Sequence, residues 1–335
     1  MTIRATSVQP RFRSTCATAV GIAALCAALV GAVSPVVAIA ADKPDAATTV
    51  KSPTAGTLLS VSFADPQHGL AVGMGGTIIR TTDGGKHWSL LKSNTNALLT
   101  AVHLLDAKRG WVVGANGTIF VTTDGGEHWQ RQVSPVPQTM YGVTMRDAQT
   151  GWIVGERGVI LHTTDGGARW QEQPSDSNAN LYAAQFVDER RGLAVGALGT
   201  VLTTEDGGEH WIARTTNNSG TFFDVVFSDA TTAWIVGNAG LVMQSNDGGT
   251  TWLDRSVSCT GSCTHVTDLL KVRFSAPKQG WMVGERGALY RTTDGGSSWD
   301  VQPSLGRATL FGLSVADATH LWAVGENGTL QPLHP

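Results

Sequence analysis

Seven copies of one motif occupy most of this 335-residue sequence and constrain its fold more than any other feature. A full copy reads GWVVGANGTIFVTTDGGEHW, which runs from Gly110 to Trp129. The Val-Gly pairs of the seven copies end at Gly73, Gly114, Gly155, Gly196, Gly237, Gly284 and Gly325. Successive copies are 41 residues apart, except for one step of 47, and such a period is typical of propellers and solenoids. The sequence therefore predicts a single repeat fold.

Each copy contains four short segments with the pattern of β-strands, here named strands A to D. An alternating run such as Leu59–Phe63 predicts strand A, and the Trp-x-Val-Gly run predicts strand B. A turn containing glycine leads to strand C, for example Thr118–Thr122, and an Asp-Gly-Gly turn leads to strand D. An Asp after strand A recurs in six copies and suits the A–B turn, where its carboxylate accepts downstream N–H groups. The pattern predicts an all-β, seven-bladed propeller of four-stranded antiparallel blades.

The two ends of the repeat predict how the ring closes. The seventh copy stops at Pro335, before a strand D. One period upstream of the first copy's strand D, Thr48–Ser52 occupies the same frame. We predict that this N-terminal strand pairs with the last one, Gly328–Leu333, and closes the propeller by covering an unpaired sheet edge.

The first 40 residues have the three parts of an export signal. A basic region without acidic residues precedes an apolar, Ala-rich stretch, and small residues follow at the positions that a signal peptidase reads; these parts are Arg4, Arg11 and Arg13, then Ala17–Val33, then Ala38 and Ala40. We predict a signal peptide over residues 1–40 and the propeller over 41–335. The alternative is a retained anchor, for which about 17 apolar residues are short. We expect a periplasmic protein, or one of the thylakoid lumen if the cell is photosynthetic.

The remaining cysteines and the charge agree with an exported protein. Cys259 and Cys263 lie in the single long step of the repeat, which is therefore an insertion, and their spacing predicts a small disulfide loop. A zinc site that includes His265 is the alternative, but it lacks a fourth ligand nearby. We expect no metal and no cofactor. The formal net charge is -3 and no basic block follows Arg13, which argues against nucleic acid as a partner.

Six copies carry an Asp box, the pattern Ser/Thr-x-Asp-x-Gly-x-x-Trp. In such a turn the carboxylate accepts backbone N–H groups, the glycines permit positive φ, and the Trp covers the turn. With one box per blade, seven-fold symmetry separates them by about 51°, so they cannot converge on one substrate. We predict structural roles for Asp83, Asp124, Asp165, Asp206, Asp247 and Asp294, and for Trp88, Trp129, Trp170, Trp211, Trp252 and Trp299.

Asp boxes also suggest a sialidase-like enzyme, which would use a Tyr nucleophile and a cluster of arginines near the axis. Tyr141 and Tyr182 share one strand A column with Leu59 and Phe223, and Tyr290 falls in a strand C column, so all three are predicted to be core residues. The repeat shows neither an arginine trio facing the axis nor an isolated pair of carboxylates. We predict a protein that is not an enzyme. The alternative is a secreted, carbohydrate-active glycoside hydrolase or glycan-binding propeller of the BNR-repeat type.

Residues that break the repeat are the candidates for binding. In a propeller the B–C turns and the D–A loops emerge on one face, and three B–C turns carry acidic residues, two of them followed by Arg. The sixth copy also adds two basic residues on strand A. We predict a partner-binding face formed by Arg157, Glu156, Arg286, Glu285, Glu326, Arg273 and Lys271. The alternative is that the Glu-Arg pairs only form well-solvated turns.

The combination of VGxxGxI, TTDGGxxW, seven copies and an export signal resembles the photosystem II stability/assembly factor family. The resemblance covers about residues 47–335. It implies a lumenal seven-bladed propeller that binds an early membrane-protein intermediate through an arginine-rich face. Only Arg157 and Arg286 match that face here. The Ala-rich signal is typical of bacteria, and the sequence does not show whether the cell is photosynthetic. We therefore expect a monomeric interaction or assembly factor for a membrane protein or envelope complex.

Overall fold

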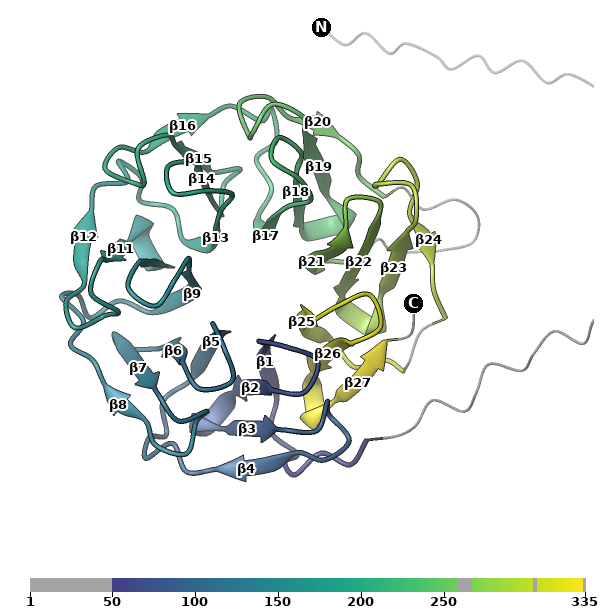
Figure 1. Ribbon diagram of the computed structural model, residues 1–335. Helices are drawn as coiled ribbons and strands as arrows, with labels where there is room; N and C mark the ends of the chain where they lie inside the picture. Colours follow the sequence, from purple (N-terminus) through teal and green to yellow (C-terminus); the bar gives the residue numbers. More distant parts are fainter. Residues whose placement is uncertain (1–49, 258–266, 304–305, 334–335) are drawn as a thin grey trace, which may run out of the picture. The chain divides into compact units, whose positions relative to one another are not determined.

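The computed structural model describes residues 50–257, 267–303 and 306–333, which form a ring of seven antiparallel sheets (Figure 1). Within each sheet the strands follow chain order from the axis outward, as strands A to D. The first four blades are β1 (Leu58–Phe63), β2 (Gly69–Gly73), β3 (Ile78–Thr81) and β4 (Ser89–Leu91); β5 (Leu99–Leu104), β6 (Gly110–Gly114), β7 (Thr118–Thr122) and β8 (Gln130–Arg131); β9 (Met140–Met145), β10 (Gly151–Gly155), β11 (Ile160–Thr163) and β12 (Gln171–Gln173); and β13 (Leu181–Phe186), β14 (Gly192–Gly196), β15 (Val201–Thr204) and β16 (Ile212–Arg214).

The remaining blades continue the ring. They are β17 (Phe222–Phe227), β18 (Ala233–Gly237), β19 (Val242–Ser245) and β20 (Leu253–Asp254); β21 (Leu269–Ala276), β22 (Gln279–Gly284), β23 (Leu289–Thr292) and β24 (Asp300–Val301); and β25 (Leu310–Val315), β26 (Leu321–Gly325) and β27 (Leu330–Leu333). The all-β, seven-bladed propeller predicted from the repeat is confirmed.

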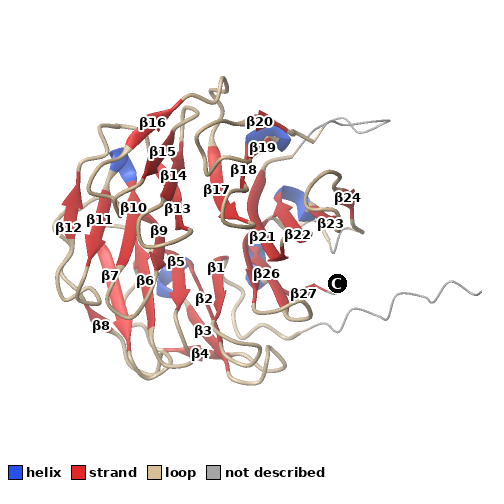
Figure 2. Ribbon diagram, turned by 45° about the horizontal axis from the view of Figure 1, so that its top comes forward, coloured by secondary structure: helices blue, strands red, loops and turns tan. Residues whose placement is uncertain are grey.

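Helical structure in the described residues is limited to single 3-10 turns (Figure 2). They are η1 (Met74–Gly76), η2 (Glu156–Gly158), η3 (Asn238–Gly240), η4 (Glu285–Gly287) and η5 (Glu326–Gly328), and each follows a strand B. None of the helices in this part of the chain has the length and hydrophobicity required to cross a bilayer.

The core lies between adjacent blades. Strand B is covered on both faces, so β6 is buried along its whole length and reads as a continuous apolar run. Trp111 and Trp152, at the same place in their strands, are almost inaccessible to solvent. Replacing such a tryptophan by alanine typically removes about 3–5 kcal/mol of stability. The period of the repeat therefore reflects one large apolar side chain buried at each of several blade interfaces.

The Val-Gly pair that marks each copy has a steric cause. Gly114 ends β6 opposite Leu99, the first residue of β5. A Cβ on Gly114 would lie 2.1 Å from the carbonyl oxygen of Leu98, the residue that precedes β5. A Cβ on Gly73 would meet the carbonyl oxygen of Thr57 at 2.0 Å in the same way. Only glycine permits the backbone to approach this closely.

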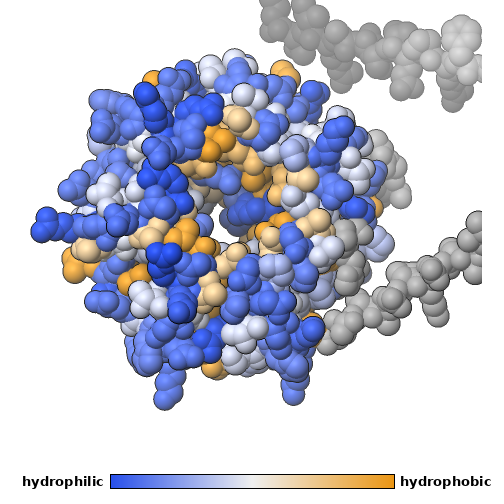
Figure 3. Space-filling view, in the orientation of Figure 1, coloured by the Kyte–Doolittle hydropathy of each residue, from blue (hydrophilic) through white to orange (hydrophobic). Residues whose placement is uncertain are grey.

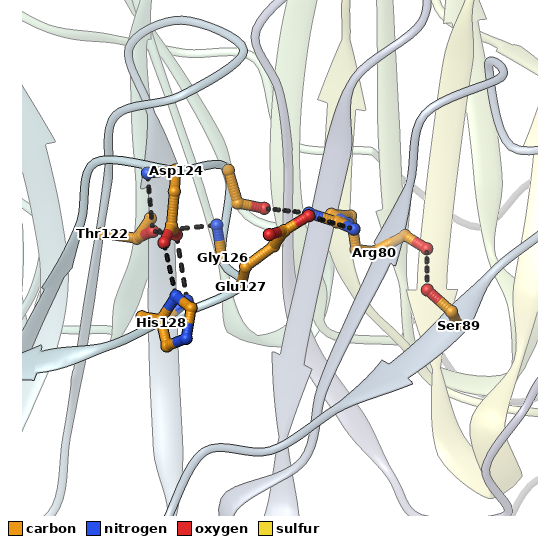
Figure 4. Close-up of polar contacts among 8 residues, drawn as sticks. Arg80, Ser89, Thr122, Asp124, Gly126, Glu127 and His128 are labelled. Carbon is orange, nitrogen blue, oxygen red and sulfur yellow. Dashed lines mark hydrogen bonds and ion pairs between the residues drawn. The ribbon is translucent and has the colours of Figure 1, made fainter.

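Each Asp box is a turn closed by its own side chains (Figure 4). In the second blade, Asp124 Oδ1 accepts the hydroxyl of Thr122 at 2.8 Å and the backbone N–H of His128 at 2.9 Å. The N–H of Gly126 donates to Thr122 Oγ1 at 2.8 Å. Gly126 has a φ of 93°, which the turn requires and glycine supplies without strain. The other five boxes repeat these bonds between Thr or Ser, Asp and the residue before Trp.

The A–B turns are closed by the recurrent Asp, as the sequence predicts. In the second blade, Asp106 Oδ1 accepts the N–H groups of Lys108 and Arg109, both at 2.8 Å. Asp65, Asp147, Asp188, Asp229 and Asp317 make the same pair of bonds in their own turns. The repeated Asp columns at both turns of one face are therefore occupied by local hydrogen bonds.

Ring closure uses the contacts of an ordinary blade interface. The seventh sheet contains three strands, and residues 50–57 carry no strand, so no fourth strand is present in the described part of the chain. The N-terminal segment nevertheless lies along the seventh blade, because a Cβ on Gly328 would lie 2.0 Å from the carbonyl oxygen of Thr54. Val50 packs against the apolar cluster shared by the first and last blades. Thr48 and Thr49, the first half of the predicted closing strand, are outside the described residues.

Two further predictions fall outside the described residues. The signal peptide over residues 1–40, with its boundary to the propeller, is one of them. The disulfide between Cys259 and Cys263 is the other.

Candidate functional site

The B–C turns form one surface, here called the turn face, whose central residues are Gly75, Asn116, Arg157, Leu198, Ala239, Arg286 and Asn327. All of them have positive φ, between 52° and 63°. For any residue except glycine, this left-handed conformation costs roughly 1–2 kcal/mol. The turn therefore projects its central side chain outward, and the Arg157 side chain is 74% exposed.

Two glutamates of the turn face accept hydrogen bonds from the backbone of their own blades. Glu326 Oε2 accepts the backbone N–H of Thr309 at 2.9 Å, and Glu156 Oε2 accepts that of Thr139 at 3.5 Å. Asn238 occupies the same place in the fifth blade and accepts the N–H of Thr221 at 2.7 Å. These polar groups tie the B–C turn to the D–A loop. Glu156 and Glu326 are accordingly half-buried, whereas Arg157 and Arg286 are exposed.

Arg157 and Arg286 are not neighbours. They belong to the third and sixth blades, so the axial opening lies between them in the ring (Figure 1). Arg157 Nε lies 3.8 Å from Glu156 Oε1, which is a loose, exposed ion pair worth little to stability. Both guanidinium groups are thus available to a partner that spans the mouth of the channel.

Lys271 and Arg273 lie on the inner strand β21, where the sequence places them, but their side chains face the axis. Lys271 Nζ is 3.3 Å from Asp224 Oδ1, and Arg273 Nη1 is 2.5 Å from Asp224 Oδ2. The Asp224 side chain is only 3% exposed. This carboxylate was not predicted from the sequence. The available signal was a pair of opposite charges, Asp224 and Lys271, in adjacent copies of one strand A column. The other five copies hold Ser60, Ala101, Gly142, Ala183 and Gly312 there.

The position of Asp224 is one at which a side chain accepts a backbone N–H from strand A of the next blade. Strand A is the inner edge of every blade, so part of its N–H groups have no partner within the sheet. Side chains of the preceding blade supply acceptors: Ser62 Oγ accepts the N–H of Leu104 at 2.9 Å, and Ser314 Oγ accepts that of Phe63 at 3.0 Å. Asp224 Oδ2 accepts the N–H of Val272 at 3.0 Å in the same manner. A buried carboxylate is tolerated there because one N–H and two cations satisfy it.

The axial channel is lined by all seven inner strands and encloses about 230 Å³. Apolar residues gather around the central opening, whereas the outer rim is largely hydrophilic (Figure 3). His103 on β5 also faces the channel. Its enclosure, together with the positive charge of Arg273, lowers the pKa of His103 to about 4. The imidazole is therefore neutral at physiological pH.

Two of the predicted core tyrosines are channel residues instead. Tyr141 and Tyr182 line the channel, with ring centroids 5.1 Å apart. The cause is a β-bulge, since β9 pairs Gly142 with Val154 but Met140 with Gly155. Tyr141 is the extra residue of the bulge, and the alternation assumed from sequence fails there. Tyr290, by contrast, packs against a core cluster as predicted.

The Asp-box histidines stay apart from one another and pair locally. Asp206, Glu209 and His210 place ligand atoms within 4.8 Å of one another, and they are the one such group found among the described residues. His210 Nδ1 is 2.7 Å from Asp206 Oδ2, so this side chain already serves the turn.

The chain matches the family model described as Photosynthesis system II assembly factor YCF48 over residues 40–94, 86–177, 169–254 and 215–300. These ranges span more than half of the sequence. The chain belongs to this family. Curated proteins provide no match to the sequence.

Solved structures with a fold similar to that of this chain include two of YCF48. One described as YCF48 bound to D1 peptide has a TM-score of 0.70 and 22% identity, over 85% of this chain and 94% of that one. YCF48 from Cyanidioschyzon merolae has a TM-score of 0.71 and 24% identity, over 87% of this chain and 99% of that one. The GH74 xyloglucanase from Xanthomonas campestris has a TM-score of 0.68 at 13% identity, over 83% of this chain and 52% of that one. At these identities the likeness shows the shared propeller fold.

Proposed function

We propose that this member of the YCF48 family is a non-enzymatic interaction factor that holds a membrane-protein client during assembly. One observation carries the proposal: the family model spans most of the propeller, and a solved YCF48 propeller that covers 85% of this chain is bound to D1 peptide. We further propose that the protein acts after export, in the periplasm or an equivalent lumen, as a monomer and without nucleic acid.

The turn face is the proposed docking surface. Arg157 and Arg286 supply exposed positive charge there, on either side of the channel mouth. Arginine is enriched at the energetic centres of interfaces, because its planar fork binds carboxylates and also packs on apolar groups. The exposed Leu198, on the blade next to Arg157, adds an apolar contact. Such a surface fits an extended acidic and apolar segment of a client.

The channel geometry supports a role other than glycoside hydrolysis. Hydrolysis requires two carboxylates, about 5–9.5 Å apart across the scissile bond. Among the described residues that line the channel, Asp224 is the single carboxylate, and two cations already occupy it. This lining supports our proposal that the likeness to the xyloglucanase is one of scaffold.

The docking surface is tested by reversing charges on the turn face and, as a control, on the opposite face. The variant with Arg157→Glu and Arg286→Glu should lose at least tenfold in capture of the client from solubilised membranes of the organism that encodes the chain. A matched control, Lys86→Glu with Arg169→Glu, changes the same charge on exposed Asp-box turns of the opposite face and should bind normally. The client is identified by crosslinking and mass spectrometry. Equal capture by both variants would refute the turn face, and turnover of fluorogenic glycosides by the wild type would refute a non-enzymatic role.

A further inference from the structure

We propose that the axial channel is a binding site for a small oxyanion, a carboxylate or a phosphate group, held by Lys271 and Arg273. This site is separate from the turn face and does not depend on the proposed client. Three observations carry it: the charge of the channel, the direction of its hydrogen-bond donors and its size.

The channel has an excess of positive charge. Its described lining contains one carboxylate, Asp224, against Lys271 and Arg273, while His103 is neutral at physiological pH. One positive charge thus remains without an opposite partner inside a confined space. Partly buried charges are screened less than charges on the open surface, so the site attracts an anion.

Arg273 has N–H groups that its bonds within the described chain do not use. Arg273 Nη1 serves Asp224 and also the carbonyl oxygen of Val272, at 2.6 Å. A guanidinium carries five N–H groups, so Nε and Nη2 retain three, and among the described residues none of these has a recorded acceptor. The side chains of Arg273 and Lys271 are 33% and 23% exposed, respectively, both on the channel side. Arg273 therefore presents the fork that binds carboxylate or phosphate in a bidentate manner.

Three serine hydroxyls of the channel can also donate a hydrogen bond. Ser60, Ser62 and Ser314 each accept an N–H from the next blade, at 3.2, 2.9 and 3.0 Å. A hydroxyl that accepts in this way still has one O–H to donate, and within the described chain these three hydrogens have no recorded acceptor. The channel therefore presents ammonium, guanidinium and hydroxyl donors together. A ligand with several acceptor oxygens satisfies such a lining better than a cation or an apolar molecule does.

The volume limits the ligand. About 230 Å³ is the share of several water molecules, each of which takes about 30 Å³ in the liquid. A carboxylate or phosphate with a few heavy atoms fits that space. Asp224 is not exposed to the ligand, and it competes with the ligand because it offsets one of the two positive charges.

Calorimetric titration of the full-length protein with sodium acetate and with sodium phosphate, at constant ionic strength in chloride, tests the site. Either oxyanion should bind saturably, and their relative affinities decide between carboxylate and phosphate. Arg273→Gln should weaken binding at least tenfold, whereas Asp224→Asn, which frees both cations and keeps an acceptor for Val272, should tighten it by a similar factor. Arg169→Gln on the outer surface should change nothing. Absence of saturable binding to the wild type, or equal binding by Arg273→Gln and Arg169→Gln, would overturn the proposal.

A measurement on the unmutated protein covers the case in which a variant fails to fold. On titration with the better oxyanion, the NMR signals of the His103 ring should move with the same dissociation constant that calorimetry gives. The ring of His68, which pairs with Asp65 in an A–B turn away from the channel, should stay unchanged. Identical movement of both rings would show general ion effects and would refute a channel site.

Discussion

Gly85 of the first Asp box lies directly against the indole of Trp322 in the last blade, and a Cβ on Gly85 would come within 2.1 Å of that ring. Gly296 meets Trp234 in the same way at the interface of the fifth and sixth blades, at 2.3 Å. The first and last blades are thus joined by the contact that joins ordinary neighbours. Phe63, Trp88 and Trp322 complete this interface, with ring centroids 5.7 to 6.1 Å apart.

Gly85→Ala should therefore open the ring at its closing interface. The added methyl group must displace Trp322, and the residue keeps a φ of 87°, so a loss of about 2–4 kcal/mol of unfolding free energy is expected. Gly248→Ala is the matched control, because this box glycine has a φ of 72° but nothing within 4 Å of its Cβ. It should lose only about 1 kcal/mol. Equal urea midpoints for the two variants would contradict the steric explanation.

The Asp boxes make stability depend on pH in the acid range. Backbone and side-chain hydrogen bonds from His128 lower the pKa of Asp124 from 3.8 to about 2, and the same kind of bond from His87 lowers that of Asp83 to about 2. A carboxyl whose pKa is lower in the folded state stabilises the fold above its unfolded pKa. That contribution is lost as the pH falls. We expect the contribution of these carboxylates to be fully present above about pH 5, and stability in urea to fall between pH 4 and pH 2.

Single substitutions assign this acid sensitivity to the boxes. Asp124→Asn retains an acceptor oxygen but cannot titrate, so its loss of stability relative to the wild type should shrink as the pH falls to 2. Asp300→Asn alters an exposed carboxylate on β24, outside any box, and should track the wild type at every pH. Parallel pH profiles for the wild type and Asp124→Asn would show that the acid sensitivity has another source.

The repeat predicts most of the fold but little of the channel. Columns 41 residues apart identify strands, Asp boxes and A–B turns, because each of these depends on contacts within about 20 residues of sequence. Asp224 and Arg273 become neighbours only when two blades are placed side by side. No other copy has an acidic residue at the position of Asp224 or an arginine at the position of Arg273. The bulge at Tyr141 is likewise invisible in a pattern of alternation. Contacts between blades, and a local bulge that interrupts the alternation of strand A in every blade, could therefore not be predicted from the repeat.

The N-terminal segment is the next feature to test, since residues 50–57 lie along the last blade without forming a strand. A protein that starts at Gly56 lacks the contact of Thr54 with Gly328 and that of Val50 with the closing cluster. Its melting temperature should fall by several degrees relative to a protein that starts at Val50. The same melting temperature for both would mean that β1 and β25 close the ring unaided, consistent with the bond from Phe63 N to Ser314 Oγ.

The two arginines of the turn face should lower the stability of the fold while they strengthen binding of the client. Arg157 and Arg286 hold φ values of 57° and 55°, where glycine is unstrained, whereas glycine also gains freedom in the unfolded chain. The variant with Arg157→Gly and Arg286→Gly should therefore be more stable than the wild type by about 0.5–1 kcal/mol, yet capture less client. Asn116→Gly, at the equivalent turn with a φ of 55°, is the control and should leave capture unchanged. Thermal unfolding and the membrane capture assay measure the two effects separately. If the arginine variant bound its client normally, the strained arginines would have no role in docking, and their conformation would be explained by the turn alone.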